Sequence, residues 1–135
     1  MAVNDEFRRK FAAFVQRAKD NQEIVVRKVG LDLMTSLVLK SPVDTGRFRG
    51  NWQVQYNLAP STVPTLDKSG GPTIAAANGA LQTVVIGQTF YLVNHLPYAQ
   101  RLEYGWSKQA PAGMVRLTLS EYDAYLTRVV GDLKK

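Results

Sequence analysis

The chain has 135 residues, of which 45% are hydrophobic and 21% are charged, and it contains no cysteine. This length and composition suit one globular domain over residues 1–135 with a core of its own, and the lack of cysteine excludes disulfides and cysteine-based zinc sites. The net charge of +6 is mild and spread along the chain, which is not typical of a dedicated nucleic-acid-binding protein.

Residues 5–39 are expected to form an N-terminal helical arm. Apolar residues recur there at steps of three and four, the helical period, at Phe7, Phe11, Phe14, Ala18, Val25, Val29, Leu33 and Leu37. Asp20 and Asn21 can mark a break into two helices, and Pro42 ends the element because the residue before a proline is pushed out of the helical region. An unbroken helix of this length would extend about 50 Å, too far for a small domain to cover, so it would imply a partner.

A small antiparallel sheet is expected within residues 51–95. Residues 51–57 alternate in the manner of a strand, and residues 84–86 and 89–93 also have strand composition. Between them lie a long loop over 58–72, rich in proline and glycine, and a short helix over 73–83. The apolar runs are all far shorter than the roughly 20 residues that cross a bilayer, so no membrane partner is expected.

Residues 114–133 give the clearest helical pattern of the chain. One continuous apolar stripe follows steps of four and three residues, through Val115, Leu119, Tyr122, Leu126, Val129 and Leu133. The order of helix, strand, loop, strands and helix predicts an α+β fold.

Two turns combine glycine, aromatic residues and arginines. The first is predicted to turn at Pro42, Asp44, Thr45 and Gly46, where glycine supplies a positive φ. It then presents Arg47, Phe48, Arg49 and Trp52.

The second segment turns at Pro97 and Gly105 and presents Tyr98, Arg101, Tyr104 and Trp106. Tryptophan, tyrosine and arginine dominate protein–protein hot spots, so these residues are candidates for a contact surface. Two other interpretations stay open. Single-stranded nucleic acid also stacks on aromatic rings beside arginines, or the aromatic residues belong to the core and the arginines are solvated.

Catalytic chemistry has little support in the sequence. Asp44, Thr45 and Gly46 match the catalytic triplet of dimeric aspartic proteases, and residues 85–87 resemble their later apolar triplet. Those folds are nearly all β, however, and Arg47 stands where they carry a small residue. His95 is the single histidine and lacks metal-ligand neighbours, while Arg101 and Glu103 can form a surface pair of little energy. We expect no catalytic, cofactor or metal site.

The order of these motifs resembles the small tail-component, or neck, proteins of long-tailed bacteriophages. That family pattern places a proline, Asp/Lys-Thr-Gly and a basic-apolar-basic run after a long helix, here residues 42–49 followed by Asn51 and Trp52. It continues with Pro-Tyr-Ala at 97–99, Glu-Tyr-Gly at 103–105 and a helix after Pro111. The resemblance covers residues 5–130.

The resemblance implies a structural virion protein without cofactors. Its copies would be assembled in the host cytoplasm into a ring at the head–tail junction, contacting other neck proteins, the tail tube or the tail terminator, while DNA passes through the lumen without sequence readout. A tail terminator or head-completion ring is the nearest alternative. A small basic nucleic-acid-binding protein and, more remotely, a dimeric aspartic protease are alternatives of other classes.

Overall fold

The computed structural model describes residues 2–133, apart from the side chains of residues 2–6, 11 and 14. Its elements are α1 (Ala2–Lys40), the 3-10 helix η1 (Arg49–Asn51), β1 (Trp52–Gln55), α2 (Gly71–Leu81), β2 (Tyr91–Asn94), α3 (Ala99–Glu103), α4 (Val115–Ser120) and α5 (Tyr122–Leu133). Strands β1 and β2 pair antiparallel, with Trp52 opposite Asn94 and Gln55 opposite Tyr91. The predicted α+β class is confirmed.

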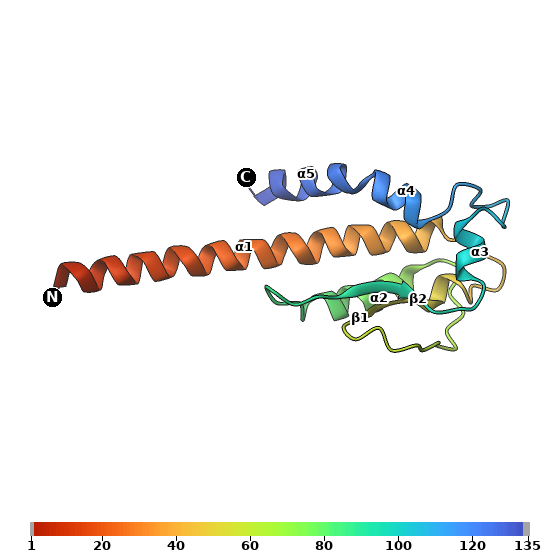
Figure 1. Cartoon of the computed structure of the whole chain (residues 1–135), viewed down its shortest axis with the longest axis horizontal. Coiled ribbons are helices and arrows are strands. Elements are labelled where there is room, and N and C mark those ends of the chain that lie inside the picture. The colour runs from red at the N-terminus through yellow and green to blue at the C-terminus, as the bar shows by residue number, and fades with distance from the viewer. Residues whose placement is uncertain (1, 134–135) are drawn as a thin grey trace.

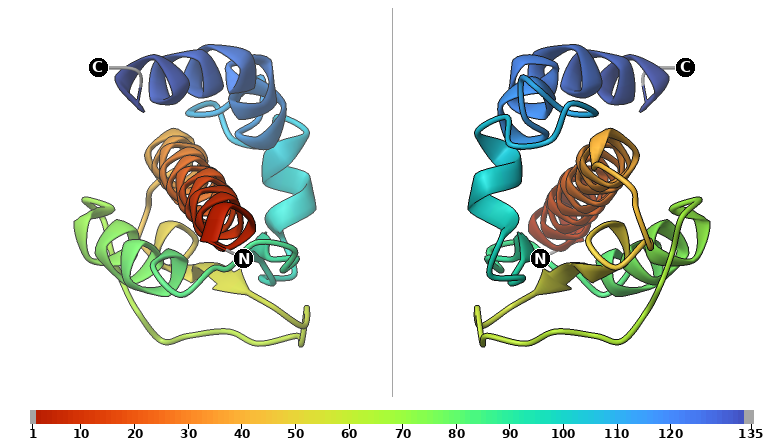
Figure 2. Two further views of the ribbon diagram at one scale, coloured as in Figure 1. Left: turned by 90° about the vertical axis from the view of Figure 1, so that its left-hand side faces the viewer. Right: turned by 90° about the vertical axis from the view of Figure 1, so that its right-hand side faces the viewer.

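Helix α1 runs through the middle of the molecule, between two layers (Figures 1 and 2). On one side it contacts α4 and α5, and on the other it contacts α2 and the two-stranded sheet. Neither outer layer is wide enough to bury an apolar face on its own. The C-terminal half of α1 is therefore the surface on which both layers are built.

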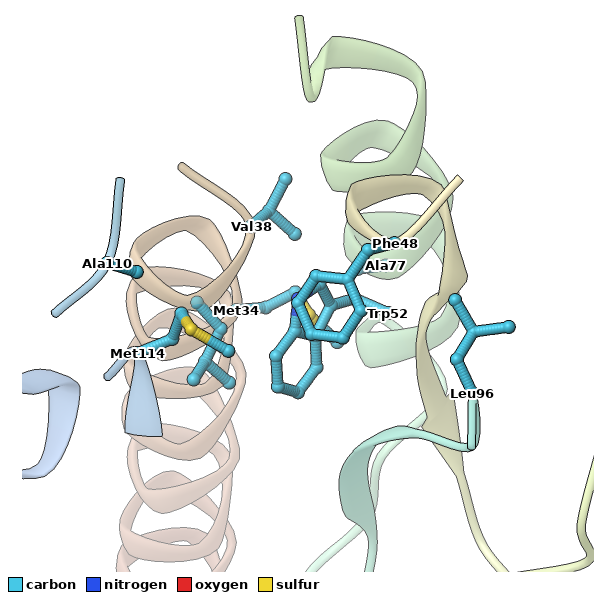
Figure 3. Packing of buried hydrophobic residues seen from close by; sticks show 9 residues of the cluster. Met34, Val38, Phe48, Trp52, Ala77, Leu96, Ala110 and Met114 are labelled. Atoms are coloured by element: carbon cyan, nitrogen blue, oxygen red, sulfur yellow. The ribbon is translucent and has the colours of Figure 1, made fainter. Parts of the chain in front are cut away.

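The core lies where α1, η1 and the two turns meet. Nine buried residues pack together there (Figure 3): Met34, Leu37, Val38, Phe48, Trp52, Ala77, Leu96, Ala110 and Met114. The Phe48 ring lies 6.0 Å from the Trp52 ring, centroid to centroid, in an edge-on arrangement. Such an aromatic pair contributes about 0.5–1.5 kcal/mol beyond the area it buries.

Helix α1 is continuous, so the break that the sequence allowed at Asp20 and Asn21 does not occur. Asp20 takes part in the helix instead, because its carboxylate accepts a hydrogen bond of 2.9 Å from Gln16 one turn earlier. One turn later, Arg27 pairs with Glu23. The predicted share of Phe11 and Phe14 in the apolar stripe lies outside the described side chains.

We call residues 2–22 of α1 the arm. Figure 1 shows this segment extending beyond every other element of the chain. Every described side chain of the arm is exposed except Val15 and Ala18, which are half-buried. At about 1.5 Å per residue the arm is about 30 Å long, comparable to the width of a small domain.

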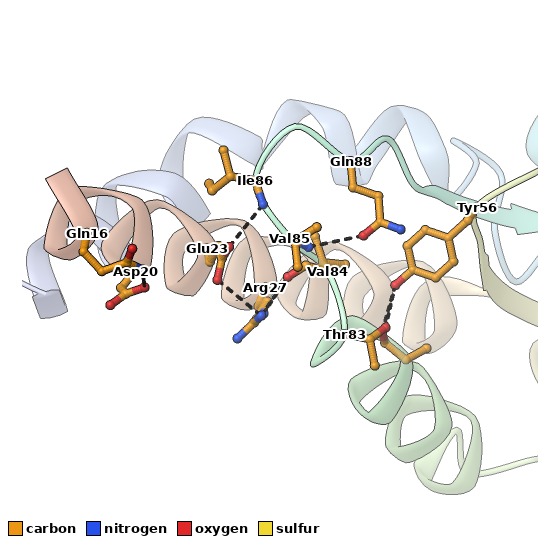
Figure 4. A network of polar contacts seen from close by, with 11 residues as sticks. Gln16, Asp20, Glu23, Arg27, Tyr56, Thr83, Val84, Val85, Ile86 and Gln88 are labelled. Carbon is orange, nitrogen blue, oxygen red and sulfur yellow. Dashed lines mark hydrogen bonds and ion pairs between the residues drawn. The ribbon is translucent and has the colours of Figure 1, made fainter. Parts of the chain in front are cut away.

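The predicted strand at 84–86 is wrong, because side chains of α1 bind the backbone groups that a neighbouring strand would need (Figure 4). Arg27 donates two hydrogen bonds to the carbonyl oxygen of Val84, at 3.1 and 2.7 Å. The Ile86 amide donates to Glu23 at 3.2 Å. These bonds tie residues 84–86 to the part of α1 that directly follows the arm.

The remaining sheet and loop boundaries are close to the expected ones. The strand expected at 51–57 is β1 alone, because Asn51 belongs to η1, and the strand expected at 89–93 is β2. Helix α2 begins at Gly71, two residues before the expected 73–83, so the loop that was expected at 58–72 ends at Gly70.

The C-terminal helix expected at 114–133 is divided at Glu121 into α4 and α5. Contacts with α1 explain the division. The Ser36 and Thr118 hydroxyls lie 2.8 Å apart in a buried hydrogen bond, and Lys40 donates to the Glu121 carboxylate at 3.0 Å. These bonds hold α4 close to the C-terminal end of α1, and α5 then follows α1 back toward the arm (Figure 1).

Candidate interaction surface

The first motif folds back over the end of α1. Arg49 donates hydrogen bonds to the carbonyl oxygens of Leu39 at 3.1 Å and Ser41 at 2.8 Å, where the last carbonyls of a helix need donors and favour a cation. The Trp52 indole donates to the Ser41 hydroxyl at 2.7 Å. Arg49 and Trp52 therefore finish the helix rather than face a partner.

Gly46 brings the loop that follows β1 into contact with the first motif. Its φ is +90°, as the predicted turn requires, and its carbonyl oxygen accepts a hydrogen bond of 3.0 Å from the Asp67 amide. A Cβ at Gly46 would lie 2.6 Å from the Asp67 nitrogen and 2.7 Å from its carbonyl carbon. Only glycine allows this approach.

Asp67 uses that position to hold the start of α2. Its buried carboxylate accepts hydrogen bonds from the amides of Gly70 at 2.8 Å and Thr73 at 2.9 Å, and from the Thr73 hydroxyl at 2.6 Å. Burial alone would raise the pKa of Asp67, but these hydrogen bonds outweigh it and lower the pKa below the usual 3.8.

The second motif packs against the first. The Tyr98 ring lies 6.0 Å from the Phe48 ring, centroid to centroid, and the Gln109 side-chain amide makes two hydrogen bonds with the backbone of Val43, at 2.9 and 3.0 Å. Turns that are about fifty residues apart in the sequence therefore form one continuous surface.

Glu103, the last residue of α3, fastens the end of that helix to the start of α4. Its carboxylate accepts hydrogen bonds from the amides of Met114, Val115 and Arg116, at 2.9, 2.8 and 3.0 Å, and forms an ion pair of 3.2 Å with the Arg116 side chain. Burial acts to raise the pKa of Glu103, but the hydrogen bonds prevail and lower it below the usual 4.5. The predicted surface pair of Arg101 with Glu103 is wrong, because the helix start occupies this carboxylate.

Two large aromatic rings remain exposed on this surface. Trp106 is 74% exposed and Tyr104 is 69% exposed. The Arg101 guanidinium lies 5.6 Å from the centre of the Trp106 ring, and the Arg116 guanidinium lies 5.1 Å from that of Tyr104. Gly105 stands between the rings with a φ of +88°, and a Cβ there would lie 2.7 Å from the Pro111 carbonyl oxygen. The rings are thus held in place by a turn that has little freedom.

A hollow of about 440 Å³ opens between the two motifs. It is lined on one side by the turn from Pro42 to Phe48 and on the other by Tyr98, Leu102 and Trp106. Asp44 and Arg47 are exposed at its edge and carry opposite charges. We call this feature the motif hollow.

The structure divides the predicted contact residues into two groups. Phe48 and Trp52 are only 6% and 7% exposed and belong to the core, which corrects their assignment to a contact surface. Arg49, half-buried, closes the end of α1. The residues that remain at the surface are Arg47, Arg101, Tyr104 and Trp106, with Tyr98 half-buried beside them. The turns at Pro42–Gly46, Pro97 and Gly105 are where the sequence predicts them.

The two protease-like triplets do not meet. Asp44 lies at the edge of the motif hollow, whereas residues 85–87 overlap the segment that Glu23 and Arg27 hold beside the arm (Figure 4). His95 lies just after β2, and its Nε2 is 2.9 Å from the Gln55 side-chain oxygen.

Sequence reasoning missed the two helix-holding carboxylates. Asp67 had a usable signal, since an acidic residue shortly before a proline-led helix start is a common boundary pattern. Glu103 had none, because the amides that it binds lie 11–13 residues further along the chain.

The part of the chain that the structure describes has neither a metal-binding cluster nor a membrane-spanning helix. No group of three or more histidine, cysteine, aspartate or glutamate side chains there is placed to hold a metal ion. None of the described helices combines the length and the apolar character needed to cross a bilayer.

Comparison of the chain with protein-family models, with curated proteins and with solved structures finds no match in any of the three.

Replacing Gly46 by alanine should destabilise the protein strongly. The added Cβ meets the Asp67 backbone and the φ is unfavourable, so we expect a loss of about 2 kcal/mol or more in the free energy of unfolding. Urea denaturation measures it. The control is Gly131→Ala in α5, where nothing lies within 4 Å of a new Cβ and alanine should raise stability by up to about 1 kcal/mol. An unchanged urea midpoint in Gly46→Ala would contradict the contact.

Stability should fall as the solution becomes acidic. The folded-state pKa values of Asp67 and Glu103 lie below the usual 3.8 and 4.5, so their contribution is complete above those usual values and is lost as pH falls through the lower folded ones. Urea midpoints between pH 7 and pH 2.5 measure this loss.

Two variants and one control identify the groups responsible for that pH dependence. Asp67→Asn and Glu103→Gln should each be less stable at pH 7 and show a shallower decline in acid than the unmodified chain. The control is Asp44→Asn, which replaces an exposed carboxylate and should leave the pH profile in place. A decline that is equally steep in all four proteins would refute the role of these carboxylates.

Proposed function

We propose that this protein is a non-enzymatic structural subunit of a tailed-phage virion, which assembles as an oligomeric ring at the head–tail junction. The observation that carries the proposal is the distribution of exposed surface. The arm extends beyond the other elements at one end of the molecule, and α3, which directly precedes the exposed residues Tyr104 and Trp106, lies toward the other end (Figure 1). A subunit with this shape has both of its ends available to neighbours.

The chemistry of the exposed surface supports contact with protein. Arginine-stacked aromatic rings that are fixed by a turn lose little side-chain entropy on binding, and tryptophan, tyrosine and arginine are the residues that carry most interface energy. The resemblance of residues 5–130 to neck proteins agrees with this use. It points to other neck proteins, the tail tube or the tail terminator as neighbours.

The ring explains how a small chain can bury so much exposed structure. In a closed ring each copy offers its contact surfaces to two neighbours, and symmetry leaves no end uncovered. DNA would pass through the lumen without sequence readout, as the resemblance implies. A tail terminator or head-completion ring would use the same type of assembly at a neighbouring position.

The first test is the mass of the purified chain in solution, by light scattering on a sizing column at low and moderate salt. The same particles are then imaged, alone and after mixing with isolated phage tails. Closed rings with a central opening, or rings that form on tail ends, support the proposal. A chain that stays monomeric in every condition and does not bind tails contradicts it.

The nucleic-acid alternative predicts a different result in the same samples. Binding through phosphates weakens steeply as salt rises, because each contact releases counterions. Binding of single-stranded DNA with a steep salt slope by a chain that forms no ring would favour that alternative.

Replacing Trp106 by alanine should abolish assembly or tail binding without unfolding the subunit. The side chain is 74% exposed, so the change in unfolding free energy should stay within about 0.5 kcal/mol. The matched control is Leu119→Ala, since Leu119 is 63% exposed on α4 and does not line the motif hollow. Rings formed by Trp106→Ala as readily as by the unmodified chain would contradict the assignment.

A further inference from the structure

The lining of the motif hollow mixes apolar and polar groups, and its edge is charged. Phe48, Leu102 and Trp106 line it, while the exposed side chains of Asp44 and Arg47 place one negative and one positive charge at its opening. The ligand that fits such a site carries an apolar ring flanked by charges of both signs. The volume of the motif hollow lies within the range of ordinary binding pockets.

The tip of the arm has that chemistry. Phe7 is 68% exposed, and the arginines that follow it, Arg8 and Arg9, are exposed as well. In the sequence two acidic residues, Asp5 and Glu6, come directly before Phe7. The order negative, aromatic, positive therefore matches the opening of the hollow, where Arg47 and Asp44 lie beside the apolar side chains of Leu102 and Trp106.

We propose that the motif hollow receives the arm tip of a second copy of this chain, with Phe7 packed against Trp106 and Arg8 beside Asp44. This inference rests on the proposed function, because it names the contact by which copies of the ring would join.

The shape of the subunit requires the contact to be made between copies. The arm lies at one end of the long axis, and α3, which contributes Leu102 to the motif hollow, lies at the other (Figure 1). Because α1 is a single unbroken helix, one chain cannot bend its arm tip into its own hollow. Phe7 lies sixteen residues beyond Glu23, or about 24 Å along the helix. That reach is sufficient to cross much of a neighbouring domain.

Such a contact joins two different surfaces, head to tail. Contacts of this kind generate a ring when the rotation between copies closes and a fibre when it does not. Each copy uses one arm and one hollow, so a chain that lacks one of them can still join to a single neighbour.

Disulfide trapping tests the contact directly, because the chain has no cysteine of its own. Arg8→Cys and Asp44→Cys are prepared as separate proteins, mixed in equal amounts and exposed to mild oxidation. A disulfide needs Cα atoms within about 7 Å, so only close apposition of the two positions gives a rapid product. Both residues are exposed. Loss of the ion pair between Arg8 and Asp44 costs little binding energy, so the packing of Phe7 against Trp106 should still hold the two copies together.

The mixture should form a covalent heterodimer at least about tenfold faster than the matched control. Binding of the arm tip in the motif hollow raises the effective concentration of the two thiols. The control pairs Arg8→Cys with Asp132→Cys, which also replaces an exposed aspartate but lies near the end of α5, away from the hollow. Adding Trp106→Ala to the Asp44→Cys protein should lower the rate of heterodimer formation to that of the control. Equal rates with Asp44→Cys and Asp132→Cys would overturn the proposal.

A chain that carries both Arg8→Cys and Asp44→Cys should form a ladder of covalent oligomers, whereas the mixture stops at the dimer. A double variant that yields dimers alone would indicate a symmetric contact and also overturn the head-to-tail arrangement.

The outcomes separate this contact from the proposed function. Rings of the unmodified chain without trapping between positions 8 and 44 would leave the proposed function standing and remove the arm-in-hollow contact. Trapping without any binding to phage tails would leave the contact standing and remove the head–tail junction as its place.

Discussion

The fold depends on the absence of a side chain at position 46. Because Gly46 has no Cβ, the backbone at Asp67 can lie directly against it, and the Asp67 amide donates to the Gly46 carbonyl. That contact brings the Asp67 carboxylate to the first turn of α2. Helix α2 then packs beside the C-terminal half of α1, where the core residues gather.

Glu103 does for α4 what Asp67 does for α2. In each case a carboxylate from outside the helix accepts hydrogen bonds from the free amides at the helix start, where the helix dipole also favours negative charge. The two carboxylates fix the loops on which the motifs lie. The surface that results from these bonds is fixed within the subunit itself, so the proposed assembly would require little further ordering there.

The two ends of the molecule differ in how much of their structure is supported. At the motif end, turns, caps and aromatic pairs support one another, and the exposed rings lie on a rigid base. At the arm, the helix extends beyond its neighbours, with Glu23 and Arg27 making the last contacts to the loop after α2. An isolated helix of this length is only marginally stable in water, so a neighbour that covers the arm would stabilise it. The proposed assembly would thus stabilise the part of the chain that the rest of the fold does not cover.

The sequence by itself determined the helical periods, the end of α1 before Pro42, and the turns at Gly46 and Gly105, because periodicity and allowed φ values are local properties. It also placed the strands β1 and β2 within a few residues. Tertiary structure decided the rest. Contacts with α1 divided the C-terminal helix at Glu121 and kept residues 84–86 out of the sheet. Only packing separated buried Phe48 and Trp52 from exposed Tyr104 and Trp106, because these aromatic residues occur in similar local sequences and differ in which distant segment covers them.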